Sequence, residues 1–221
     1  MERTRRKNIQ RVSNITNAKN IIIEYIANNA KSYLIITIIF FIGIILGIMF
    51  VNNANSEQTN QIFSYLTNFI DSIKEGYKVE EGTLLKNSII KNFQITLLLW
   101  FLGLTVIGIP LIYCVICYKG FCIGYTVSSI IATIGTGKGI IFILASMLFQ
   151  YVIFIPCILT LAVSGLKVYK QIMEDRRKEN IKIQIVKHTL LSIFILVMLL
   201  ISSFVETYVS GNLSVIFLKY C

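Results

Sequence analysis

The chain has 221 residues, of which 55% are apolar and only 14% are charged. Soluble domains carry about 25% charged residues, so this composition excludes an ordinary soluble domain, and its high apolar content excludes intrinsic disorder. The net charge of +10 would suggest nucleic acid as the partner of a soluble protein. In a chain this apolar we expect a lipid bilayer as the surroundings and no nucleic-acid partner, so the question is which side of the membrane carries the charge.

Five uncharged runs predict membrane-spanning helices. A bilayer core about 30 Å thick needs ~20 helical residues to cross it, and backbone groups in lipid must be hydrogen-bonded within their own segment. The predicted spans are 33–51, 92–118, 120–137, 139–166 and 189–205, with Lys119 in a short loop between the second and the third. The expected fold is therefore an all-α, polytopic membrane bundle of five transmembrane helices with amphipathic surface helices.

The distribution of lysine and arginine predicts the orientation and the domain organisation. With five spans, fifteen of these residues lie on the side of the N-terminus and six on the other side. The positive-inside rule then places the N-terminus in the cytoplasm and the C-terminus outside, in a multi-pass protein of the cell membrane. We expect a basic cytoplasmic segment over 1–32, with a helix on the inner membrane surface over 15–30, and one membrane domain over 33–221.

The predicted outer loop, 52–91, contains an amphipathic helix over 57–74. Its apolar side chains recur with a period of 3.6 residues, and they include Phe63, Leu66, Phe69 and Ile70. Two interpretations stay open at this point. The helix lies on the outer leaflet or caps the bundle, or its apolar face docks an extracytoplasmic partner.

Three sequence patterns that can mark a catalytic or binding site are better explained by structural roles in this chain. The Gly-Thr-Gly-Lys-Gly sequence at 135–139 lacks the first glycine and the Ser or Thr of a phosphate-binding loop, which favours a tight outer turn. Cys114 and Cys117 lie inside an apolar span, away from the water or cation that a reactive thiolate needs, so they indicate packing. His188 is predicted as a polar tip at the cytoplasmic start of the last span. No enzymatic activity, metal or cofactor is expected.

Two pairs of glycines are spaced for close helix packing. Gly43 with Gly47, and Gly120 with Gly124, each have three residues between them, a spacing that lets helix backbones approach. We expect them to pack within the bundle rather than to form a dimer.

Four polar or helix-breaking residues stand out within the apolar runs. Pro110 and Pro156 are predicted to interrupt the second and fourth spans, and Gln150 could satisfy the backbone groups that Pro156 frees. Glu206 lies near the outer end of the last span, where a carboxylate is costly and implies a partner or a role. An interfacial, solvated carboxylate is the simpler alternative.

Four short motifs follow one another along the chain: Trp100-Phe101-Leu102-Gly103, Gly108-Ile109-Pro110, Lys119-Gly120-Phe121 with Gly124, and Glu206-Thr207-Tyr208-Val209-Ser210. In their order and spacing they resemble the stage II sporulation protein M family, and the resemblance covers essentially the whole chain. Two departures are visible: Gly211 stands where the family usually has proline, and Phe149-Gln150-Tyr151 stands where it has Pro-Gln-Asn.

This resemblance implies a non-enzymatic membrane scaffold of endospore formation. In the family, the scaffold recruits the peptidoglycan-degrading stage II sporulation proteins P and D to the septum, where wall cutting drives engulfment. A transmembrane subunit of a transporter or permease is the alternative, because helices kinked by Pro and Gly also build permease cores. That alternative needs several ionisable residues at membrane depth, whereas only Glu206 approaches this in the sequence, and no second half of the chain repeats the first.

Overall fold

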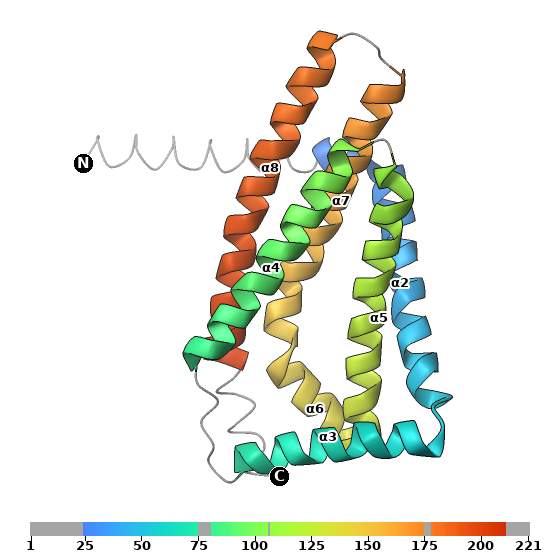
Figure 1. Ribbon diagram of the computed structural model, residues 1–221, viewed down its shortest axis with the longest axis vertical. Helices are drawn as coiled ribbons and strands as arrows, with labels where there is room; N and C mark the ends of the chain where they lie inside the picture. The colour runs from blue at the N-terminus through green and yellow to red at the C-terminus, as the bar shows by residue number, and fades with distance from the viewer. Residues whose placement is uncertain (1–23, 75–80, 106, 175–177, 211–221) are drawn as a thin grey trace, which may run out of the picture.

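The structure is a computed structural model that describes residues 24–74, 81–105, 107–174 and 178–210. Most of the predicted N-terminal segment, residues 75–80 of the predicted outer loop and all residues from Gly211 onward lie outside this description. The described elements are the helices α2 (Ala30–Asn52), α3 (Ser56–Lys74), α4 (Glu81–Leu104), α5 (Gly108–Ile134), α6 (Thr136–Ser146), α7 (Leu148–Glu174) and α8 (Lys178–Phe204), and the π-helix η1 (Val205–Ser210) (Figure 1).

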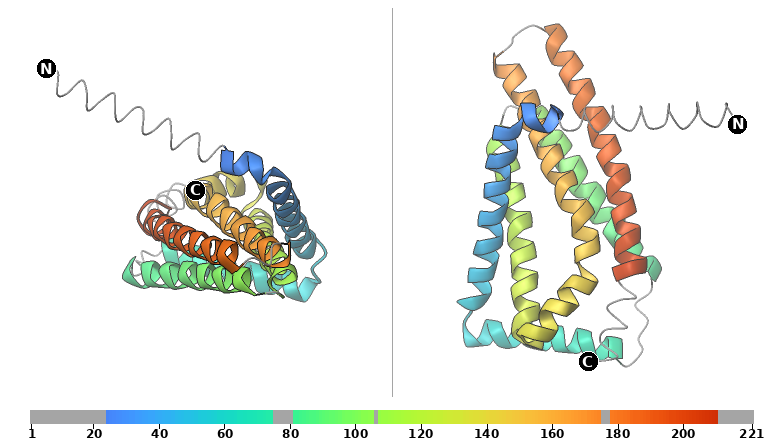
Figure 2. Two further views of the ribbon diagram at one scale, coloured as in Figure 1. Left: turned by 90° about the horizontal axis from the view of Figure 1, so that it is seen from above. Right: turned by 180° about the vertical axis from the view of Figure 1, so that it is seen from behind.

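The long helices run lengthwise, and α3 lies across one end of them (Figures 1 and 2). We call this end the α3 end; α2 and α5 finish there. At the opposite end, α2 begins and the chain turns from α4 into α5 and from α7 into α8. Within the bundle α2 packs chiefly against α5, while α4, α7 and α8 pack against one another. The all-α bundle predicted from the sequence is confirmed.

The contact between α2 and α5 is made by glycines from both helices. A Cβ atom at any of the four would overlap the backbone of the other helix. Gly43 faces the carbonyl of Cys117, Gly47 that of Phe121, Gly120 that of Phe40 and Gly124 that of Ile44. Because neither helix has side chains at these points, the two backbones touch directly. The two glycine pairs therefore pack against each other within the chain, as the sequence predicted.

A second close crossing joins α4, α7 and α8. A Cβ atom at Gly103 of α4 would lie 2.6 Å from Nε2 of His188 on α8 and 2.9 Å from Cα of Gly165 on α7. A side chain at Gly165 would be too close as well, since its Cβ atom would lie 3.0 Å from Cα of Gly103. The three helices can approach this closely only because both positions lack a side chain.

The turn between α4 and α5 corrects the predicted second and third spans. The run 92–118 is not one helix: α4 ends before the turn, and α5 begins at Gly108, whose N–H donates to the Thr105 carbonyl at 3.1 Å. A Cβ atom at Gly108 would overlap the carbonyl oxygen of Leu102, so the tight turn requires glycine here. Lys119, predicted to lie in a loop, is in the middle of α5.

The predicted fourth span is also divided. The run 139–166 begins in α6, breaks at Met147 and continues in α7. The turn predicted at 135–139 is confirmed at Gly135, which has a φ of 93° and separates α5 from α6. A φ in this left-handed region is accessible to glycine without steric cost.

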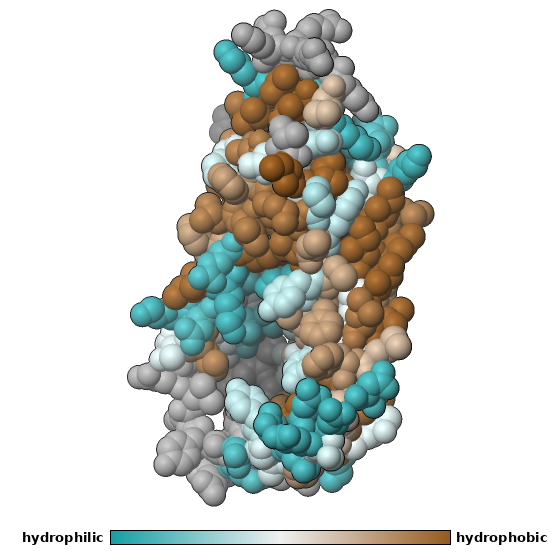
Figure 3. All heavy atoms as spheres, turned by 45° about the vertical axis from the view of Figure 1, so that its right-hand side comes forward, coloured by the Kyte–Doolittle hydropathy of each residue, from teal (hydrophilic) through white to brown (hydrophobic). Residues whose placement is uncertain are grey.

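The sides of the bundle present apolar side chains outward, as a membrane protein requires. Along α2 the exposed residues include Leu34, Ile38, Phe41 and Ile45, and apolar residues cover much of the face seen in Figure 3. Within the described residues, four helical stretches are long and apolar enough to cross a membrane. They are Ala30–Asn52, Gly108–Ile134, Gln150–Met173 and Ile181–Tyr208.

Candidate functional site

Helix α3 presents different side chains to the two sides of the α3 end. Phe63 is 50% exposed and does not line the cavity beneath the helix. Ile62 and Leu66 are half-buried and line this cavity, and Tyr65 joins them there although it is 75% exposed. The amphipathic helix predicted over 57–74 is thus present, with Leu66 turned toward the bundle and Phe63 away from it. Two further members of the predicted docking face, Phe69 and Ile70, belong to α3, but their side chains lie outside the description.

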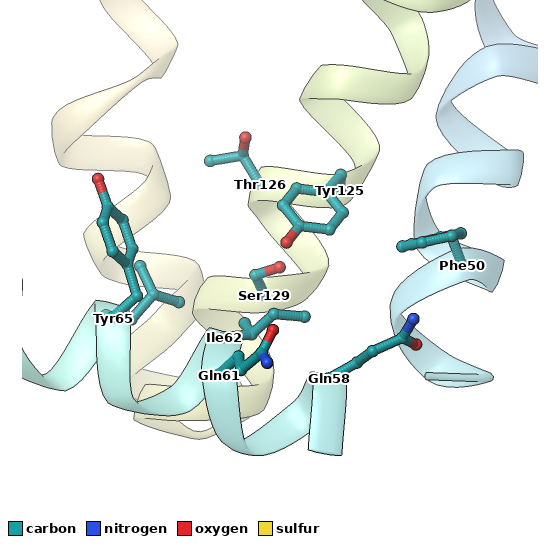
Figure 4. A pocket seen from close by; sticks show the side chains of 9 residues that line it. Phe50, Gln58, Gln61, Ile62, Tyr65, Tyr125, Thr126 and Ser129 are labelled. Carbon is teal, nitrogen blue, oxygen red and sulfur yellow. The ribbon is translucent and has the colours of Figure 1, made fainter. Parts of the chain in front are cut away.

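The cavity beneath α3 has a volume of about 380 Å³. It lies between α3 and the α3-end half of α5, with Phe50 of α2 at one side (Figure 4). Its lining is formed by aromatic rings, amides, hydroxyls and aliphatic side chains: Phe50, Gln58, Gln61, Ile62, Tyr65, Leu66, Tyr125, Thr126 and Ser129.

Ser129 is the least satisfied residue of this lining. Only 4% of the residue is exposed, and its Oγ has no hydrogen-bond partner. Its neighbour Ser128, by contrast, donates to Oδ1 of Asn52 at 3.4 Å. The cavity residues of α5 could not be picked out from the sequence, because the hydroxyls of Tyr125, Thr126 and Ser129 lie in a run that also contains Ser128 and Thr133.

Glu206 is tied to α4 at the end of the last helix. Oγ of Ser88, a residue only 7% exposed, donates a hydrogen bond to Oε2 of Glu206. Glu206 lies in η1, where the wider π-helical turn replaces α-helical geometry, a feature often found at functional sites. Tyr208, two residues on, is 48% exposed and stacks its ring on Phe204 with centroids 6.2 Å apart.

Further pairs continue this contact between α4 and α8. Nδ2 of Asn92 donates to Oγ of Ser203 at 2.7 Å and to the Leu199 carbonyl at 3.2 Å. Nearer the opposite end, Nε1 of Trp100 donates to Oγ1 of Thr189 at 3.2 Å. We call these four hydrogen bonds, from Ser88–Glu206 to Trp100–Thr189, the polar seam. They hold residues 88–100 of α4 against α8 and η1.

His188 is not the interfacial tip that the sequence predicted. Its side chain is fully buried where α4, α7 and α8 cross, with Nδ1 2.9 Å from Oγ of Ser164 and Nε2 3.4 Å from the Trp100 carbonyl oxygen. The prediction failed because it placed the residue by its charged neighbour, Lys187. The imidazole of His188 instead points at Gly103, inside the bundle.

The two prolines differ in their effects. Pro110 is the third residue of α5, where a helix tolerates proline because the first-turn N–H groups have no intrahelical acceptor; it therefore does not interrupt a span. Pro156 lies inside α7, as predicted. Gln150, one turn and a half earlier, contributes its backbone carbonyl, which accepts a hydrogen bond from Oγ of Ser202 at 3.3 Å.

Lys119 projects from the middle of α5 toward α7. The residue is half-buried, and its Nζ lies 5.9 Å from the centre of the Phe154 ring. A cation over an aromatic face is favourable, more so away from water. The long aliphatic stem of a lysine also lets a mid-helix residue reach a polar environment.

The start of α2 is attached to α7 by tyrosines. The hydroxyl of Tyr33 donates to Oγ1 of Thr160 at 3.2 Å, and Nζ of Lys167 lies 5.2 Å from the centre of the Tyr25 ring. Burial raises the pKa of Tyr25 above its usual value, so its hydroxyl stays protonated at neutral pH. These contacts hold the chain just before α2 against the opposite end of the bundle.

No metal centre is formed by the residues that the structure describes, since they contain no group of three or more His, Cys, Asp or Glu side chains placed to hold an ion. Cys114, Cys117, Cys122 and Cys157 are free thiols. The Cys-x-x-Cys pair lies within α5, with Cys114 exposed on its surface.

Comparison with known proteins identifies the family. A family model described as Stage II sporulation protein M matches residues 36–211, which takes in every long helix of the bundle as well as α3 and η1. No curated protein and no solved structure matches the chain. The chain therefore belongs to the stage II sporulation protein M family, and it is a multi-pass membrane protein of sporulation.

Proposed function

We propose that the protein is a non-enzymatic scaffold that recruits the peptidoglycan-degrading stage II sporulation proteins P and D to the septum, where they drive engulfment. The observation that carries the proposal is the position of α3. This helix lies across the end of the bundle, and the ring of Phe63 is 50% exposed and is not part of the cavity lining. Exposed aromatic side chains on a supported helix are suited to form the centre of a protein interface.

The orientation that this function requires is supported by the charge distribution. With Lys119 inside α5, fourteen lysines and arginines lie in the sequence within 1–31 or 167–187, and the other six lie within 74–91 or at 138 and 219. The start of α2 and the junction of α7 with α8, at the opposite end, belong to the first group, whereas α3 belongs to the second. Under the positive-inside rule the opposite end faces the cytoplasm, and the α3 end faces the wall. In this arrangement α4 is the fifth span, and the C-terminus lies outside the cytoplasm.

The contacts inside the bundle favour a rigid support for α3. The polar side chains of α4 and α8 bond to one another across the polar seam, and glycine contacts hold α2 against α5. Each contact ties together helices that end near α3. A rigid support reduces the entropy lost when a partner binds, which favours recruitment.

The proposal is tested by placing a charge at the exposed face of α3. Phe63→Asp should leave the amount of protein in the membrane unchanged, because the side chain is already half exposed, but should reduce co-purification of stage II sporulation proteins P and D from sporulating cells. Ser64→Asp is the matched control. It adds the same charge one residue along the same helix, at an exposed position whose hydroxyl bonds only to the Gln61 carbonyl.

Equal recovery of both partners with wild type, Phe63→Asp and Ser64→Asp would show that this face of α3 does not bind them. Equal loss with both variants would assign the effect to charge near the membrane surface rather than to the aromatic face.

A further inference from the structure

We propose that the cavity beneath α3 binds the ring of an uncharged sugar, of the N-acetylhexosamine class found in cell-wall glycans. The first observation is the unpartnered hydroxyl of Ser129, which is buried in the lining. Buried polar groups in native proteins nearly always have a partner. A buried hydroxyl at a cavity wall is placed to bond to a polar group that enters the cavity.

The second observation is the chemistry of the other lining residues. Amides come from Gln58 and Gln61, and hydroxyls come from Tyr65, Tyr125 and Thr126. An amide offers both a donor and an acceptor, and a hydroxyl offers the same. The Thr126 hydroxyl already donates to the Cys122 carbonyl at 2.8 Å, and Oε1 of Gln58 accepts from the Asn55 N–H at 3.3 Å. Donors toward a ligand therefore come from the glutamine amides and the two tyrosine hydroxyls, which match a ligand that carries many hydroxyl groups. None of the nine lining residues is charged, which disfavours a phosphate or a carboxylate as the bound group.

The third observation is the set of aromatic rings at the cavity. Tyr125 is braced by Phe121, with ring centroids 6.3 Å apart, and by Phe50 at 6.2 Å. Figure 4 shows the Tyr125 ring above Ser129 and the Tyr65 ring at the other side of the cavity. A flat apolar face beside hydrogen-bonding groups suits the apolar face and the hydroxyl edge of a pyranose ring. The volume of about 380 Å³ lies within the range of small-molecule sites.

This inference deepens the proposed function and rests on its orientation, which places the α3 end on the side of the wall. A scaffold that holds glycan beside wall-cutting enzymes would bring substrate and enzyme together at one surface. Because α3 both covers the cavity and exposes Phe63, sugar and protein partner would use opposite faces of one helix.

The test uses the full-length protein in phospholipid nanodiscs, titrated calorimetrically with a soluble oligomer of N-acetylglucosamine. Wild type should bind the oligomer, and Ser129→Ala should weaken binding by about fivefold to tenfold, the effect of one lost hydrogen bond. Ser129→Ala should not lower the unfolding temperature, since the hydroxyl has no partner within the protein. Ser128→Ala, whose side chain lies outside the cavity lining, is the matched control and should bind the sugar like wild type.

Three results would overturn the inference. They are no heat of binding with wild type, equal affinity of wild type and Ser129→Ala, and binding of the sugar only when the nanodisc itself contains a glycolipid. Because the titration contains no protein partner, its failure would leave the recruitment of stage II sporulation proteins P and D untouched. Loss of recruitment with the sugar affinity intact would contradict only the proposed function.

Discussion

Replacing Gly103 by alanine should loosen the crossing of α4, α7 and α8. The new Cβ atom would lie 2.6 Å from Nε2 of His188 and 2.9 Å from Cα of Gly165. The histidine is held by Ser164 and by the Trp100 carbonyl, and the second obstacle is backbone, so neither can give way by a simple rotation. The helices must therefore move apart.

The size of the effect follows from two opposing contributions. Overpacking in a close-packed interior costs about 1–3 kcal/mol, and the backbone obstacle places this site in the upper half of that range. Alanine is favoured over glycine within a helix by about 1 kcal/mol. The net loss in the free energy of unfolding should be about 1–2 kcal/mol, measurable by SDS titration of the protein in mixed micelles.

Gly82→Ala is the control on the same helix, because a Cβ atom there meets nothing within 4 Å. It should be neutral or stabilising by up to about 1 kcal/mol. A cycle with His188→Ala adds a second check: without the imidazole, Gly103→Ala should cost less, with a coupling on the order of 1 kcal/mol. If Gly103→Ala and Gly82→Ala have the same stability, α4 does not approach α7 and α8 as closely as described, and the reasoning is refuted.

Two further predictions concern Glu206 and the orientation. Glu206→Gln should keep wild-type abundance in the membrane, since its amide oxygen can still accept from Ser88. Glu206→Leu should lower abundance, because the buried Ser88 hydroxyl is then unpaired at a cost of about 1–3 kcal/mol; equal damage from both variants would instead indicate a role for the ionised carboxylate. A reporter enzyme that is active only outside the cytoplasm should be active when inserted within residues 56–74 and inactive within residues 174–178. Activity at the second position would refute the proposed orientation.

Features encoded by local spacing were predicted from the sequence. The apolar period of α3 depends on residues three and four apart, and so do the glycine pairs of α2 and α5. A helix places such residues on one face regardless of what surrounds it. The helix over 57–74 and the packing of both glycine pairs within the bundle could therefore be predicted without knowing the tertiary structure, whereas the meeting of Gly43 and Gly47 with Gly120 and Gly124 is seen only in the fold.

Features that depend on contacts between distant segments were predicted incorrectly or missed. Lys119 was assigned to a loop because charge usually marks one, yet its Nζ lies beside Phe154 on another helix. His188 was assigned to the membrane surface because of its neighbour in sequence, whereas Ser164 and Gly103 hold it inside. The cavity beneath α3 brings residues 58–66 together with residues 125–129, and no short pattern in the sequence encodes that meeting.

The most direct measurement of the central claim is the position of stage II sporulation proteins P and D in sporulating cells. Fluorescent fusions of both should concentrate at the septum in cells that make the wild-type protein. They should spread over the membrane in cells that lack it or that make Phe63→Asp at wild-type abundance. Unchanged septal concentration of both proteins in cells lacking this chain would contradict the account, because recruitment would then proceed without the scaffold.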